Sequence, residues 1–156
     1  MATEKWIAGT VGLTWTVAYT SAATFDSIVN GNAILGDLAL DNSSNLDIFM
    51  DLSLILGSAA FVAPNYVGFY LYPLTQDGTT YGDGRFGTSA AGPPPSSYYR
   101  GTFGLVAATQ AQTAEINGVV MPPGKWKPVL YNQGGVTLGG SGGNKLYYRT
   151  YNRSVA

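Results

Sequence analysis

Hydrophobic residues alternate with other residues along several short segments of the chain. In the clearest case, every second position is hydrophobic: Leu46, Ile48, Met50, Leu52, Leu54 and Leu56. A period of two predicts a strand with one buried face. Seven further segments show weaker alternation or are rich in aromatic and β-branched residues: 13–19, 33–40, 66–72, 102–107, 115–120, 125–131 and 145–151. The pattern therefore predicts about eight strands.

The strands are separated by clusters of Gly, Pro, Asn and Ser, and no long helical pattern interrupts them. Many short strands with this spacing are typical of an all-β, single-domain β-sandwich, and eight strands in two sheets is the jelly-roll number. Residues 21–29 are the one helix candidate, which is too short to be stable alone. We expect residues 1–12 to form an N-terminal arm and residues 13–156 to form the sandwich.

The alternation also predicts the core of the sandwich. Val129 and Leu130 are neighbours in the chain, so one of the two is expected to point away from the core. The predicted core residues are Trp15, Val17, Ile48, Met50, Leu52, Leu54, Val67, Phe69, Leu71, Val129 and Leu130.

The composition of the chain limits the catalytic and metal-binding chemistry that it can perform. The chain has no Cys and no His, which excludes thiolate metal sites, Cys nucleophiles and every catalytic triad that depends on a histidine. We expect no enzymatic activity and no cofactor. Charged residues are 11%, well below the usual share. Such a surface is typical of a protein that is permanently attached to a partner, or of a soluble domain rich in uncharged polar residues, and both alternatives are open.

The charges are unevenly distributed. Six acids and one base precede Val62, whereas five bases and no acid follow Glu115. We expect the strand at 46–56 to lie beside a late basic strand, with Asp47 or Asp51 near Lys145 or Arg149. Five late bases and a net charge of −1 do not predict nucleic-acid binding.

Asp47 and Asp51 are interpreted as solvent-facing strand charges. If they lie four residues apart on one strand, they are separated by about 13 Å, which is more than the carboxylates of a glycosidase need.

Several motifs have a chemical and a structural interpretation. Tyr147, Arg149 and Tyr151 share one face of the last strand and could stack a sugar or pack across strands. Asp77 and Asp83 flank a Gly-rich loop that could bind calcium, although turn formation explains both residues. The match of residues 82–87 to a dinucleotide-binding motif is weak, because prolines follow it in place of a helix. No segment resembles a signal peptide or is long enough to span a membrane.

Three long motifs resemble small virion-associated proteins of tailed bacteriophages. They are Ala63-Pro-Asn-Tyr-Val-Gly-Phe-Tyr-Leu-Tyr-Pro-Leu-Thr-Gln-Asp-Gly, Pro122-Pro-Gly-Lys-Trp-Lys-Pro-Val-Leu-Tyr-Asn and Lys145-Leu-Tyr-Tyr-Arg-Thr-Tyr-Asn-Arg. The resemblance covers most of the chain from Leu13 onward. It implies a capsid decoration (cement) protein, a homotrimer that binds the phage major capsid protein. Such a protein is made in the host bacterial cytoplasm and lies on the outer surface of the head. The alternative is a carbohydrate-binding or receptor-binding module of a phage tail or fibre.

Two segments offer large amphipathic side chains outside the strand pattern, as an attachment surface requires. One is the N-terminal arm with Trp6, and the other follows a proline run and ends in Tyr98, Tyr99 and Arg100. We expect these residues to bind the partner. The alternative is that both segments fold back onto their own sandwich.

Overall fold

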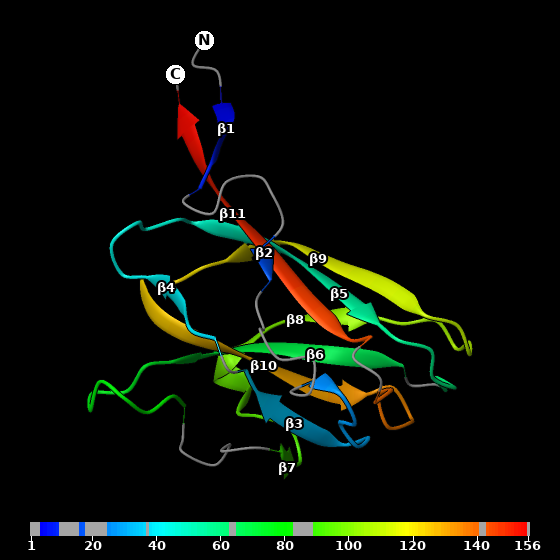
Figure 1. The fold of residues 1–156 in the computed structure, drawn as a ribbon. Coiled ribbons are helices and arrows are strands. Elements are labelled where there is room, and N and C mark those ends of the chain that lie inside the picture. The colour runs from blue at the N-terminus through cyan, green and yellow to red at the C-terminus, as the bar shows by residue number, and fades with distance from the viewer. Residues whose placement is uncertain are drawn as a thin grey trace.

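The protein folds into two antiparallel sheets that face each other (Figure 1). The structure is a computed structural model and describes residues 4–9, 16–17, 25–36, 38–62, 65–82, 89–140 and 143–155. The predicted all-β sandwich is confirmed, and these described ranges contain eleven strands in place of about eight. The pattern missed β1 and β7, which are short and lie at sheet edges, and the single segment predicted at 33–40 corresponds to two strands, β3 and the start of β4.

Sheet A contains five strands, in the order β1-β11-β5-β9, and β2 also pairs with β11. Their bounds are β1 Glu4–Ala8, β2 Thr16–Val17, β5 Phe49–Leu56, β9 Gln112–Val120 and β11 Lys145–Val155. The longest strand, β11, thus joins both early strands to β5 in the middle of the chain.

Sheet B contains six strands, in the order β7-β3-β10-β6-β8, and β4 pairs with β10. Their bounds are β3 Asn32–Leu35, β4 Leu40–Asn42, β6 Tyr66–Pro73, β7 Ser89–Ala91, β8 Tyr99–Gly104 and β10 Gly124–Gln133. A 3-10 turn, η1 (Ser96–Tyr98), leads into β8. The segment predicted as a helix is described only from Phe25, and the positive φ of 62° at Ser27 rules out a helix as far as Val29.

The core between the sheets contains most of the predicted residues. Those that are fully buried there are Met50, Leu52, Leu54, Val67, Phe69, Leu71 and Leu130. Ile48 was predicted wrongly and is 45% exposed, because β5 begins only at Phe49 and the preceding residues form a turn in which Leu46 has a φ of 51°. Trp15 lies outside the described residues, and the side chain of Val17 is not described.

Of the neighbours Val129 and Leu130, one points away from the core between the sheets, as expected, but it is buried as well. Leu130 faces the interior between the sheets, whereas Val129 belongs to a second apolar cluster with Ala33, Tyr70 and Tyr72. The second cluster lies on the outer face of sheet B, where side chains from the connection between β6 and β8, including Tyr98, pack against it. Both faces of β10 are therefore buried at the middle of the strand.

At one end of sheet A, β1 and the last part of β11 extend away from the sandwich as a two-stranded ribbon (Figure 1). Glu4 pairs with Val155 and Ala8 pairs with Tyr151. The part of the expected arm that the structure describes as a strand is therefore an edge strand of sheet A.

Candidate functional site

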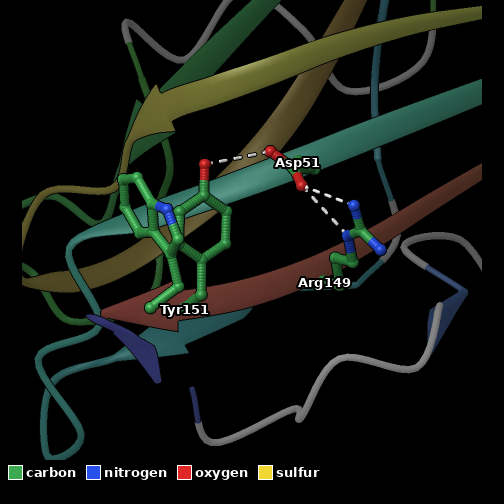
Figure 2. Close-up of a pocket in the computed structure, with 4 residues that line it drawn as sticks. Asp51, Arg149 and Tyr151 are labelled. Atoms are coloured by element: carbon green, nitrogen blue, oxygen red, sulfur yellow. Dashed lines mark hydrogen bonds and ion pairs between the residues drawn. The ribbon is translucent and has the colours of Figure 1, made fainter. Parts of the chain in front are cut away.

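A surface pocket lies on the outer face of sheet A, at the base of the ribbon. Trp6, Asp51, Arg149 and Tyr151 line it, and its volume is about 320 Å³ (Figure 2). Three strands supply these side chains: β1 supplies Trp6, β5 supplies Asp51, and β11 supplies the other two.

The alternation of β11 sets the orientation of two of these residues. Leu146 and Thr150 are buried on its inner face, so Arg149 and Tyr151 point outward. Arg149 pairs with Asp51 across β11 and β5, and Tyr151 pairs with Phe49. Residues paired across antiparallel strands project from the same face, which brings the four side chains together.

Asp51 is the most constrained residue of the pocket. Arg149 donates from Nε at 3.0 Å and from Nη2 at 2.9 Å to Asp51 Oδ2. The Tyr151 hydroxyl donates to Asp51 Oδ1 at 3.1 Å, and the backbone N–H of Gly118 donates to the same oxygen at 2.9 Å. Four donors therefore hold a carboxylate whose side chain is only 9% exposed.

A β-bulge makes the Gly118 donor available. The pairing of β5 with β9 shifts between Met50 and Leu52, and Gly118 lies in the shifted part of β9 with a φ of 70°. A glycine adopts this left-handed conformation without the steric cost that a side chain would add. The Gly118 N–H in this shifted part of β9 donates to Asp51.

The position of Asp51 confirms one expectation and corrects another. The early acidic strand does lie beside the late basic strand, and Asp51 pairs with Arg149 as expected. The interpretation of Asp47 and Asp51 as solvent-facing charges was wrong, because both are buried. Asp51 is covered by its donors, and Asp47 precedes β5, where its Oδ1 accepts a hydrogen bond from Asn152 at 2.9 Å.

Aromatic rings form the other side of the pocket. The Tyr151 and Phe49 rings are stacked, with centroids 5.6 Å apart and an interplanar angle of 21°. Trp6 stands nearly perpendicular to both, at 84° to Tyr151 and 79° to Phe49. Burial, and after it the Asp51 carboxylate, raises the pKa of the Tyr151 hydroxyl above its ordinary value. Tyr151 therefore keeps its proton, which it donates to Asp51.

The structure brings together three residues that the sequence placed in two separate hypotheses. Trp6 was expected to bind a partner, and Arg149 and Tyr151 were expected to form part of a ligand face. All three line one pocket. Tyr147 lies on the same face of β11, opposite Ser53, but it is not among the residues that line the pocket.

The other expected attachment residues lie on sheet B. The Tyr98 ring packs against buried Tyr72, with centroids 4.8 Å apart, and the Tyr99 ring packs against Tyr70 at 5.4 Å. Arg100 donates to the backbone oxygens of Ser97 and Tyr99. These side chains contact their own sandwich, although Tyr99 remains partly exposed.

A second pocket, of about 460 Å³, lies at the same end of the molecule as the ribbon. Its lining is almost entirely apolar, and it is formed by Asn42, Leu46, Asp47, Ile48, Val120, Met121, Pro122 and Pro123. Ile7 of the ribbon lies close by, since its partner Asn152 accepts a hydrogen bond from the backbone N–H of Ile48 at 2.8 Å. We call the exposed residues Ile7, Leu46, Ile48 and Val120 the apolar rim.

The described residues contain no group of three or more acidic side chains that could hold a metal ion. Asp77 accepts hydrogen bonds from Thr75, Thr79 and Thr80, as expected for a turn, and these bonds lower its pKa. Asp83, the other candidate calcium ligand, lies outside the described residues. In the described part of the chain, no helix has the length and apolar character of a membrane span.

The sequence did not indicate Asp51, Phe49 or Gly118 as parts of a site. The uneven distribution of charge identified the Asp51–Arg149 neighbourhood, but alternation alone could not reveal the bulge. A glycine near the end of a predicted strand was the available signal for it.

No protein-family model matches the chain, and the search of curated proteins found no match. The assignment of a function therefore depends on the residues of the chain and on their geometry.

Proposed function

We propose that the protein is a non-enzymatic structural protein of a tailed-phage virion, namely a capsid decoration protein that binds the major capsid protein shell and stabilises it. Three long sequence motifs resemble such proteins, and the low charge fits a chain that remains attached to an assembly. The proposal includes location on the outer surface of the head and association as a homotrimer.

The observation that carries this proposal is the apolar rim. Among the described residues, nine large hydrophobic side chains are exposed. Five of the nine lie at the ribbon end: Trp6 and the four residues of the apolar rim, Ile7, Leu46, Ile48 and Val120. Exposed hydrophobic residues that are scattered singly need no explanation, but a group at one place marks an interaction surface. A shallow apolar pocket beside the group gives a partner side chain a place to insert.

The rim can supply a useful part of the binding free energy. Fully burying an aliphatic side chain contributes about 1.5–3 kcal/mol, and these residues are roughly half exposed, so each can contribute about 1 kcal/mol on docking. Replacing two of them should therefore weaken binding by about 2 kcal/mol, which corresponds to a roughly thirtyfold change in the dissociation constant.

The test is rebinding to purified heads that have lost the protein. The double variant Ile48→Ser with Val120→Ser should bind such heads roughly thirtyfold more weakly than the wild type while melting at nearly the same temperature. The matched control is Val62→Ser with Val106→Ser, which removes two exposed valines away from the rim. Equal binding by the rim variant and the wild type would contradict the docking surface, and no binding of the wild type to heads would contradict the function.

The same assay tests the expectation that Trp6 and Tyr98–Arg100 anchor the protein. Trp6→Ala is the variant expected to affect the stability of the isolated protein less, because the Trp6 side chain is 65% exposed. Tyr98 packs against buried Tyr72, so its replacement should also lower the stability of the isolated protein.

A further inference from the structure

The Asp51–Arg149 pair is expected to contribute little net free energy to the stability of the sheet. An ion pair taken out of water loses hydration, and well-packed hydrophobic residues often replace such a pair with no loss of stability. Here the Asp51 carboxylate also accepts a hydrogen bond from Gly118, which has a positive φ and lies in a bulge of the neighbouring strand. Bulges are frequent beside binding sites, where they redirect a backbone group or a side chain. The arrangement keeps the exposed part of the Arg149 guanidinium and the Tyr151 hydroxyl in fixed positions.

The pocket has a flat apolar wall and a polar wall. Trp6 is largely exposed, and its orientation is set by two edge-to-face contacts, with Tyr151 at 5.2 Å and with Phe49 at 6.0 Å. The polar wall is the chain of hydrogen bonds from Tyr151 through Asp51 to Arg149 (Figure 2). A ligand that fills the pocket must present an apolar face to the Trp6 indole, and the edge of the ligand must carry polar groups.

The charge and the size of the pocket narrow the class of ligand. The guanidinium of Arg149 is balanced by the Asp51 carboxylate at 2.9 Å, so these two lining residues present no net charge and favour a neutral ligand. The Tyr151 proton points to Asp51, which leaves the phenolic oxygen able to accept, whereas Arg149 donates. A hydroxyl group satisfies both partners, because it donates and accepts. A volume of about 320 Å³ is at the lower end of ligand pockets and suits one ring.

We infer that the pocket formed by Trp6, Asp51, Arg149 and Tyr151 binds one neutral pyranose ring of a glycan. The C–H face of the sugar lies on the Trp6 indole, and its hydroxyl groups bond to Tyr151 and Arg149. Asp51 is a positioning residue, since it is buried beneath the two side chains that it orients. A nucleobase is less well matched, because the rings meet at nearly right angles and do not form a parallel slot.

The experiment is a titration of the purified full chain, without capsid, followed by NMR of the backbone amide of Gly118. This amide donates to Asp51 at the pocket and is present in every variant. The probes are the methyl pyranosides of glucose, galactose, mannose and N-acetylglucosamine, with adenosine as a comparison. At least one glycoside should produce a saturable shift in the millimolar range. Trp6→Ala and Tyr151→Leu should each weaken its binding at least roughly tenfold.

Tyr147→Leu is the matched control, because Tyr147 lies on the same face of the same strand but does not line the pocket. It should leave glycoside binding unchanged. If Tyr151→Leu fails to fold, the exposed Trp6→Ala variant still decides the question. The inference is overturned if no glycoside produces a saturable shift, if only adenosine does, or if Tyr147→Leu weakens binding as much as the pocket variants. Because no capsid is present, such a failure leaves the proposed docking to heads unaffected.

Discussion

Removing both partners of the Asp51–Arg149 ion pair should cost less stability than the sum of the losses from removing each partner alone. Arg149→Met deletes two of the four donors to the carboxylate and leaves Asp51 with Gly118 and Tyr151. Breaking a fully buried pair costs about 3–5 kcal/mol, because the remaining charge is left uncompensated. Here the Arg149 side chain is 34% exposed, so water can partly replace it, and we expect a loss of about 2 kcal/mol.

Asp51→Leu should cost a similar amount, because it leaves the Arg149 guanidinium and the Gly118 N–H without their acceptor. The double variant Asp51→Leu with Arg149→Met exchanges the pair for apolar side chains. It should be less destabilised than the sum of the single variants by at least about 1 kcal/mol.

The assay is urea denaturation at neutral pH, in which the free energy of unfolding is obtained for the wild type, both single variants and the double variant. A coupling energy below about 0.5 kcal/mol would refute the reasoning, because it would mean that the two side chains act independently. Loss of less than about 0.5 kcal/mol in both single variants would show that the network does not constrain the sheet.

Two further predictions concern stability. Leu52→Ala should lower the free energy of unfolding by about 2–5 kcal/mol, since Leu52 is fully buried between the sheets, and a loss below about 1 kcal/mol in reversible unfolding would contradict that placement. Burial raises the pKa of Tyr148, and burial and Asp51 raise the pKa of Tyr151. The stability that these two protonated hydroxyls contribute is therefore complete below the ordinary tyrosine pKa of 10.0, and it is lost as the pH rises through the raised pKa values. A pH series of unfolding free energies should show that Tyr148→Phe reduces the alkaline decline, and an identical decline in this variant would contradict the assignment.

The alternation of residues predicted the strands well where one face of a strand meets the interior. In β11, the inward positions of Leu146 and Thr150 and the outward position of Arg149 follow directly from the period of two. Charge added information that alternation does not contain, because it linked two strands that are far apart in the chain. The neighbourhood of the two strands, with Asp47 or Asp51 near Lys145 or Arg149, could therefore be predicted without the structure, and the structure shows that the pair is Asp51 with Arg149.

Alternation failed where burial depends on a connection that crosses a sheet face. Val129 is buried because Tyr98 and other side chains between β6 and β8 pack on the outer face of sheet B, and no local pattern in β10 records this. The prediction that Ile48 is buried was wrong for the opposite reason, since the alternating pattern continues through Ile48 although the strand begins only after it. The pocket could not be predicted either, because it requires the pairing of β1 with the end of β11 and a bulge in a third strand.

The register of β1 against β11 determines whether an exposed residue of the ribbon faces the pocket or the apolar rim. Trp6 and Ile7 are adjacent, so they project from opposite faces of β1, and a slip of one residue against β11 would exchange them. The base of the ribbon opposes such a slip. The Gly9 N–H donates to Thr150 O at 2.9 Å, and a Cβ at Gly9 would lie only 2.7 Å from Asp47 Oδ2, so a glycine is required there.

On the other strand of the ribbon, Asn152 bonds to both Asp47 and the backbone of Ile48. These hydrogen bonds at the ribbon base therefore hold Trp6 toward the pocket and Ile7 toward the other residues of the apolar rim. A change at Gly9, Asp47 or Asn152 should disturb both surfaces together, whereas changes in the apolar rim or at Tyr151 in the pocket should each disturb one. For this reason the variants that separate docking from ligand binding are those that leave the ribbon base intact.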